Sequence, residues 1–311
     1  MSMMDDFSAP NPTLPNAQDL AYFAAMHEAN PPGRPDHSAQ MWNQRAEAWK
    51  KERTHQRKGD ERVISAVAYL EKRGILRPES DVVDIGCGPG RFVVAFAKRV
   101  HHVVGLDISD KMVEHGMEHV REVGLTNAVL RICDFQTLDI EREGYKGAFD
   151  LVFSSMTPAI HGMGGLMKSM EMSRGWCCSI NHLGGSNSLS TQIAREVFDR
   201  EVPARWASPW FYSLFNVLFL MGYNPETSYE TLRREIWIQP DEAYAKFLMG
   251  QILTPEEASA DNEDKIMAWL KYHANEDGLV QAVSEASYGS ILWNVKDKTE
   301  RPNYFKPDQG V

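Results

Sequence analysis

Short apolar runs alternate with longer amphipathic stretches through the centre of the chain. The apolar runs predict strands at Val82–Ile85, Val103–Leu106, Ala128–Cys133, Phe149–Phe153 and Trp176–Asn181. The amphipathic stretches predict helices at Arg91–Arg99, Asp110–Val123, Leu166–Ser173 and Leu189–Asp199. Alternation of strands with helices is typical of βαβ units, so we expect a parallel sheet.

Helices are also predicted before this region. Prolines interrupt residues 1–35 and leave room for one short helix, Asp19–Ala29. A pattern with one helical face then follows, at Trp42, Arg45, Ala46 and Trp49. A further helix from about Asp60 ends at Gly74. We therefore expect a Pro-rich segment over 1–35 and a helical cap over 36–78.

The end of the chain predicts two more strands, Thr231–Ile238 and Ser290–Val295, which suit an antiparallel edge on a parallel sheet. Helices at Glu242–Met249 and Pro255–His273 would form an insertion over about 239–287. The whole pattern predicts an α/β fold over residues 79–311. It is a doubly wound, mostly parallel, seven-stranded sheet with an antiparallel edge.

An aromatic and aliphatic stretch, Trp206–Met221, predicts a buried helix, with a homodimer or membrane-surface contact as the alternative. Polar residues interrupt the stretch, and it is shorter than the ~20 apolar residues of a membrane span. We therefore expect no membrane span.

Charge and cysteine usage narrow the class of protein. The formal net charge of −10 disfavours a broad basic surface for nucleic acid, so we expect a small-molecule partner and no nucleic acid. The four cysteines form no spaced framework and are expected to be reduced thiols. The first residues carry acids and no apolar core of a signal peptide, so the expected location is the cytoplasm.

The most informative segment is the turn after the first strand. Three glycines, Gly86, Gly88 and Gly90, are spaced by one residue each and lead into a helix. Glycine lets the backbone turn tightly and lets a ligand approach without interference from a Cβ. The even spacing departs from the dinucleotide G-x-G-x-x-G pattern, so an NAD-type oxidoreductase is only a further alternative.

Carboxylates stand near the carboxyl ends of three predicted strands. Asp84 precedes the glycine turn, where it can face a cationic amino group. Asp107 ends the second strand, where an acid can accept hydrogen bonds from ribose hydroxyls. Asp134 follows the third strand and can accept from an exocyclic amine. Ile108 and Met112, at the start of the next helix, could sandwich a purine.

Together these residues resemble the cofactor site of class I, Rossmann-like, S-adenosylmethionine-dependent methyltransferases, over about residues 81–165. The resemblance implies S-adenosyl-L-methionine as cofactor, S-adenosyl-L-homocysteine as product and no metal. It implies a cofactor site of Asp84, Gly86, Cys87, Gly88, Gly90, Asp107, Ile108, Met112, Asp134, Phe135 and Ser154. The Asn/Asp-Pro-Pro-Tyr motif of many amino-methylating members is absent, which favours a small-molecule N, O, S or C acceptor.

Substrate chemistry is expected in the loop after the fourth strand. His161 is the candidate general base, because imidazole titrates near neutral pH. The alternative is a loop histidine that only fills space. Trp42 and Arg45 could fold over the cofactor, with Arg45 meeting a carboxylate, or Arg45 could simply be solvated.

Two alternatives stay open beside an active enzyme. A cofactor-binding protein without catalysis could act as a regulatory or partner subunit. The sulfur-dense stretch from Met156 to Cys178 predicts core packing. The more specific alternative is a sulfur-lined pocket for a thiol, metalloid or flat apolar substrate.

Overall fold

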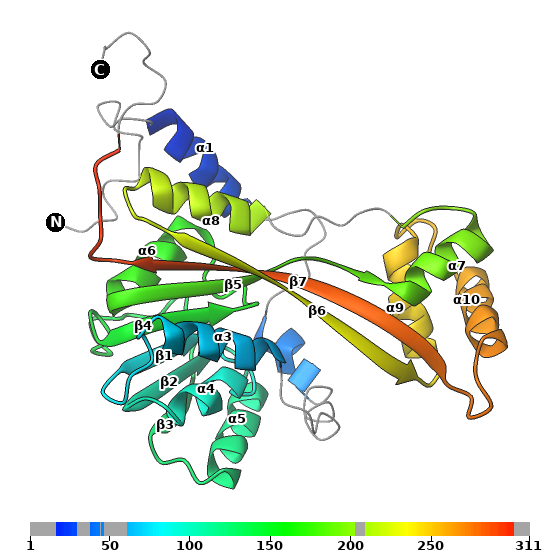
Figure 1. The fold of residues 1–311 in the computed structure, drawn as a ribbon, viewed down its shortest axis with the longest axis horizontal. Helices are drawn as coiled ribbons and strands as arrows, with labels where there is room; N and C mark the ends of the chain where they lie inside the picture. The colour runs from blue at the N-terminus through cyan, green and yellow to red at the C-terminus, as the bar shows by residue number, and fades with distance from the viewer. Residues whose placement is uncertain (1–16, 30–37, 44, 47–60, 203–208, 302–311) are drawn as a thin grey trace. The chain divides into compact units, whose positions relative to one another are not determined.

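The computed structural model describes residues 17–29, 38–43, 45–46, 61–202 and 209–301. The chain forms two compact units (Figure 1). The sheet unit comprises Met1–Asn181, Pro209–Ser228 and Gly289–Val311. The helical unit comprises His182–Ser208 and Tyr229–Tyr288.

A seven-stranded sheet has the order β3-β2-β1-β4-β5-β7-β6. Its strands are β1 (Asp81–Ile85), β2 (His102–Asp107), β3 (Ala128–Ile132), β4 (Phe149–Ser155), β5 (Ser173–Asn187), β6 (Glu226–Ile238) and β7 (Val280–Asn294). Strands β1 to β5 pair in parallel, and β5-β7-β6 forms the antiparallel edge. The sheet predicted from the sequence is therefore confirmed.

The described helices are α1 (Ala17–Glu28), α3 (Glu61–Lys72), α4 (Arg91–Ala97), α5 (Asp110–Glu122), α6 (Gly162–Met172), α7 (Ser188–Phe198), α8 (Pro209–Leu220), α9 (Glu242–Ile252) and α10 (Ala260–Tyr272). Residues 39–43 and 45–46 are also helical. Strand β7 begins ten residues before its expected start at Ser290. Its first part therefore lies inside the expected insertion.

The described part of the expected apolar helix begins at Pro209 and has a buried face, whereas Trp206 lies outside the described residues. Helix α8 lies beside α1 (Figure 1), and its Phe211, Leu214, Val217 and Leu218 are buried. Tyr212 on the same helix is 55% exposed. Among the described residues, no helix is both long and apolar enough to cross a membrane.

An aromatic cluster fixes α4 against the centre of the sheet. The Phe153 ring of β4 lies 4.6 Å from the Phe92 ring and 5.0 Å from the Phe96 ring of α4, centroid to centroid. Phe153 and Phe96 are fully buried. Because α4 begins at the glycine turn, this packing fixes the direction in which the turn leaves β1.

The helical unit has its own core. Ile193 of α7, Leu248 of α9 and Ile266 of α10 are buried in one cluster. Each of the three helices begins with a side-chain cap: Asn187 accepts from Leu189 N, Asp241 from Tyr244 N, and Ser259 from Asn262 N. Capping fixes where each helix begins, so the unit does not depend on apolar burial alone.

One arginine ties three segments together at the amino end of the sheet. Arg174 Nη2 donates to Asp150 Oδ2 at 2.6 Å and to Asp81 Oδ2 at 2.8 Å, and its Nη1 donates to the Ala148 carbonyl at 2.8 Å. The hydrogen bonds from Arg174 hold the pKa of Asp150 below its usual value. This cluster therefore stabilises the fold where Asp150 is ionised.

We expect Arg174→Met to lower the free energy of unfolding by about 1–2 kcal/mol at pH 7, because two carboxylates lose their donor. A lowered folded-state pKa contributes stability above the unfolded pKa and loses it as pH falls through the folded value. The deficit should therefore shrink below about pH 4. Urea denaturation at several pH values measures it.

Arg195→Met is the control, because Arg195 is 62% exposed and, among the described residues, its ion pair is with Glu201. Its effect should stay within about 0.5 kcal/mol. Equal effects of the two variants would contradict a structural role for the Arg174 cluster.

Candidate functional site

The glycine turn has the backbone conformation that its sequence predicts. Gly86, Gly88 and Gly90 have φ of 69°, 53° and 73°. The amides of Gly86 and Cys87 both donate to the Leu106 carbonyl, at 2.7 and 3.0 Å. A Cβ at Gly86 would overlap the Thr157 side chain, so the loop after β4 lies directly against the turn.

Asp107 joins the glycine turn to the start of α5. Its Oδ2 accepts from the Gly88 amide at 2.8 Å, and its Oδ1 accepts from the Ser109 amide at 2.9 Å. Burial raises the pKa of this carboxyl, and the two amides act in the opposite direction. Each oxygen keeps a second lone pair, so the group can still accept from ribose hydroxyls.

Asp84 is the most unusual group of the site. Its side chain is 2% exposed, and its Oδ2 has no hydrogen-bond partner among the described residues. Burial, with the nearby Asp107 charge, raises the pKa of Asp84 to about 8. A buried polar atom without a partner is costly, and a cationic donor placed here would satisfy it.

The residues expected around the adenosine have mixed surroundings. Ile108 is half-buried, Met112 is 1% exposed and Phe135 is 3% exposed. Lys168 lies over the Phe135 ring at 5.5 Å and donates to the Phe135 carbonyl. Asp134 is exposed, and its Oδ1 accepts from the Gln136 amide at 3.0 Å. Cofactor contacts of these residues, Cys87 and the buried Ser154 stay predictions.

The segment before α3 reaches the same end of the sheet through Asn43. Its Nδ2 donates to Asp110 Oδ1 and its Oδ1 accepts from Ser109 Oγ, both at 2.6 Å. Ser109 Oγ also accepts from the Met112 amide and so caps α5. The sequence pattern singled out neighbouring residues and missed this asparagine, which carries no signal of its own.

Trp42 and Arg45 contact each other. The Arg45 guanidinium lies 5.2 Å from the Trp42 ring centroid, and Arg45 is exposed. A contact of either residue with the cofactor stays a prediction. Trp49 lies outside the described residues.

A small cavity of about 20 Å³ lies beside the carboxyl-terminal part of β4 and the middle of β5. Ser154 and Thr157 line it from β4 and the loop that follows, and His27 of α1 and Trp210 of α8 line it from the helices. Met156, beside Thr157, has φ 57°, a left-handed conformation that a side chain rarely adopts. Such strain is concentrated at functional sites.

His161 lies at the N-cap of α6, and its side chain makes no capping bond. Its ring stacks on the Trp210 ring with centroids 5.9 Å apart. A general-base role for His161 stays a prediction. His27 stacks on the same indole at 5.4 Å, and sequence patterns did not single it out.

The cysteines of the sulfur-dense stretch are buried. Cys177 and Cys178 line the same cavity, and burial raises the pKa of Cys178 to about 12. Thiols this weakly acidic stay uncharged at neutral pH. In the part of the chain that the structure describes, no group of three or more His, Cys, Asp or Glu side chains could hold a metal ion.

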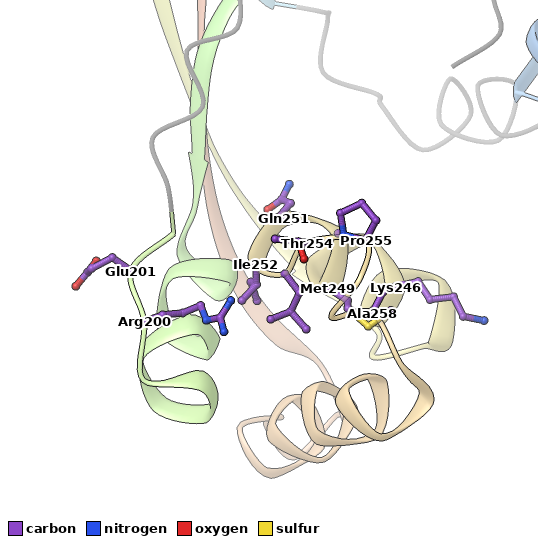
Figure 2. Close-up of a pocket in the computed structure, with 11 residues that line it drawn as sticks. Arg200, Glu201, Lys246, Met249, Gln251, Ile252, Thr254, Pro255 and Ala258 are labelled. Atoms are coloured by element: carbon purple, nitrogen blue, oxygen red, sulfur yellow. The ribbon is translucent and has the colours of Figure 1, made fainter. Parts of the chain in front are cut away.

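The helical unit carries a separate, wider pocket of about 670 Å³ (Figure 2). Met249 and Ile252 lie in its wall, with Arg200 and Lys246 also lining it. The Arg200 guanidinium pairs with both carboxylate oxygens of Glu257, at 2.8 and 2.9 Å. Lys246 Nζ lies 3.7 Å from Glu263 Oε1. Both cations therefore lie near carboxylates, and the pocket contains none of the expected site residues.

One comparison with known proteins falls within the sheet unit. Residues 82–168 match a protein-family model described as "Methyltransferase domain". The match spans less than a third of the chain, and over those residues it bears out the expected methyltransferase class.

Curated relatives match about a third of the chain. A 23S rRNA (uracil(1939)-C(5))-methyltransferase RlmD of Klebsiella pneumoniae is 37% identical over 106 residues, 34% of this chain and 23% of that protein. EEF1A lysine methyltransferase 2 of Homo sapiens is 28% identical over 119 residues, 36% of this chain and 50% of that protein. The chain thus covers a minor part of the rRNA enzyme, and the expectation of no nucleic acid is not borne out.

Solved structures also align with this chain, at low identity. Magnesium protoporphyrin IX methyltransferase from Synechocystis PCC 6803 is 16% identical, with 89% of this chain and 94% of that chain covered and a TM-score of 0.42. YcgJ from Bacillus is 17% identical, with 73% and 97% covered and a TM-score of 0.41.

We expect Asp84→Asn to change how stability depends on pH in the protein without ligand. A carboxyl with a raised folded pKa contributes stability that is present below the unfolded pKa and lost as pH rises through the folded value, here about 8. The variant should gain about 1–3 kcal/mol over the parent between pH 5 and pH 9. Urea denaturation at the two pH values measures this.

Asp139→Asn, at an exposed loop position, is the matched control and should follow the parent at both pH values. Parallel pH profiles for the parent and Asp84→Asn would contradict the raised pKa.

Proposed function

We propose that this chain is an S-adenosylmethionine-dependent methyltransferase with a small-molecule acceptor. The observation that carries the proposal is the buried Asp84 Oδ2, which lies at a turn of three left-handed glycines and receives no hydrogen bond from any described residue. The ammonium group of the cofactor's methionyl part supplies the missing donor and charge. A purely structural turn has no need of such a carboxylate.

The strand ends would hold the cofactor. Asp107 would accept from the ribose hydroxyls with its remaining lone pairs, and Asp134 from the adenine amine. Ile108 and Met112 would contact the purine. Ser154 and the glycine turn would lie nearest the sulfonium. The sheet order reverses between β1 and β4, and ligands of open α/β sheets bind at such switch points.

The cofactor supplies an electrophilic methyl on a good leaving group. The chain's own residues then have to align the acceptor in line with the S–CH₃ bond and exclude water. The loop after β4 is suited to this task, because Thr157 lies against Gly86 on one side and lines the cavity on the other. This continuity between turn and cavity favours an active enzyme over a binding protein without catalysis.

The proposal of a small-molecule acceptor rests on the net charge of the chain. A net charge of −10 opposes the clustered Lys and Arg that neutralise phosphates. The rRNA and lysine methyltransferases among the relatives share only about a third of this chain. The remaining parts of the chain therefore leave room for a different acceptor.

We expect S-adenosylhomocysteine to bind the parent protein with release of about one proton near pH 7, because pairing with its ammonium ionises the Asp84 carboxyl. Asp84→Asn should bind about tenfold or more weakly and release none. Calorimetry in buffers of different ionisation enthalpy measures both quantities.

The exposed acid variant Asp261→Asn, in α10 of the helical unit, should match the parent in both. If the parent failed to bind the compound, the proposed function would be wrong. Binding with unchanged proton release in Asp84→Asn would remove Asp84 from the site.

We also expect methyl transfer to small molecules. With methyl-labelled S-adenosylmethionine, label should enter an RNase-treated, protein-free ultrafiltrate of the source cells rather than total RNA, because the negative surface repels phosphates. Asp84→Asn is the control and should transfer about tenfold less or lower still. Label confined to RNA or to protein would contradict a small-molecule acceptor.

A further inference from the structure

His27 is a buried histidine whose hydrogen-bond roles are fixed by its neighbours. It is 2% exposed, and its Nδ1 lies 3.1 Å from Ser213 Oγ. Ser213 Oγ donates to the Trp210 carbonyl at 3.2 Å. A hydroxyl has one hydrogen, so Ser213 can only accept from His27, and the hydrogen of the neutral ring lies on Nδ1.

The ring is neutral at physiological pH. Burial lowers the pKa of His27 to about 4, the Glu28 carboxylate acts in the opposite direction, and His161 acts in the same direction as burial. Nε2 therefore has a lone pair and no hydrogen. It is buried, and no described residue donates to it.

A second unsatisfied group lies in the same cavity wall. Trp293 Nε1, on β7, is buried and has no acceptor among the described residues. Among the described residues that line the cavity, His27 Nε2 is therefore an acceptor without a donor, and Trp293 Nε1–H is a donor without an acceptor. The cavity volume of about 20 Å³ accommodates one hydroxyl, amine or thiol group, or one water.

The cavity adjoins the place where the methyl group would be presented. Ser154 at the end of β4 lines it, as does Thr157, whose side chain lies against Gly86 of the glycine turn. The His161 ring stacks on Trp210, which lines the cavity, but His161 itself does not line it. His27 is therefore better placed than His161 to meet an acceptor.

We propose that His27 Nε2 binds the hydrogen of an N–H, O–H or S–H acceptor and takes its proton during methyl transfer, with Trp293 Nε1–H as a further hydrogen-bond donor to the acceptor. The inference rests on the proposed function. The bond from the acceptor atom to the methyl carbon forms as the S–CH₃ bond breaks, and that electron pair stays on sulfur. The proton passes to His27 and then to water. The single positive charge lies on the sulfonium before the transfer and on the His27 imidazolium after it.

His27→Asn is the informative variant, because the Asn amide nitrogen can replace Nδ1–H towards Ser213 while the Nε2 acceptor is removed. We expect label transfer to the ultrafiltrate to fall by about 100-fold or more. Affinity for S-adenosylhomocysteine should stay within about twofold of the parent, which also reports on folding. His101→Asn, at an exposed position beside Asp81, is the control and should match the parent in both measurements.

Long-range ¹H–¹⁵N correlation spectra of histidine-labelled protein with S-adenosylhomocysteine supply a readout that needs no acceptor. We expect His27 with hydrogen on Nδ1 and none on Nε2 between pH 6 and 8. Hydrogen on Nε2 would overturn the proposal.

Unchanged label transfer by His27→Asn would also overturn the proposed role of His27. The two groups without a described partner, His27 Nε2 and Trp293 Nε1–H, would then be explained by a buried water between them. A loss in His161→Asn without one in His27→Asn would assign the base to His161 instead. Failure of the parent to bind S-adenosylhomocysteine or to label the ultrafiltrate would count against the proposed function. The tautomer spectrum would still test His27.

Discussion

Two carboxylates beside one bend of the backbone impose the main constraint on the sheet unit. Asp84 is buried with one oxygen that no described residue hydrogen-bonds, and Asp107 is held by the Gly88 and Ser109 amides. Burial raises the pKa of both carboxyls, and the nearby Asp107 charge raises the pKa of Asp84 further, which means that the fold resists full ionisation of the pair. The arrangement costs stability in the absence of a cationic ligand. The buried pair of carboxylates is therefore better explained by the binding of a cationic ligand than by a contribution to folding stability.

The rest of the sheet unit holds this bend in place. The aromatic packing of α4 on β4 fixes the helix that leaves the turn. At α5, a Cβ on Gly116 would come within 3.3 Å of the Pro89 backbone and would overlap Leu130, so only glycine lets α5 approach so closely. Ser109 then caps α5, and its Oγ donates to Asn43 Oδ1 in the segment before α3. The position of the glycine turn thus depends on residues that lie far apart in the sequence.

The end of α1 connects the N-terminal part of the chain to the cavity. Glu28 accepts from the Met163 amide at 2.6 Å and so satisfies the start of α6, whose own N-cap residue supplies no side-chain bond. Its neighbour His27 lines the cavity beside Trp210. One helical turn therefore supports the loop after β4 and also supplies the only described imidazole in the cavity wall. Because capping and lining come from adjacent residues, α1 belongs to the site rather than to a separate appendage.

The sequence alone determined the sheet, the glycine turn and the acids at the strand ends, because each depends on residues close together in the chain: alternating apolar runs, three spaced glycines, and carboxylates after apolar strands. It placed β1, β2 and β4 to within two residues, whereas β7 begins ten residues early because its first part lies in the helical unit. Only the tertiary structure decided which distant side chains reach the site. Asn43, His27, Trp210 and Trp293 have no local signature, since their roles arise from contacts across long sequence separations, such as the 186 residues between His27 and Ser213. A sequence pattern reports periodicity along the chain, and the hydrogen-bonding state of a buried ring is set by neighbours that only folding brings together.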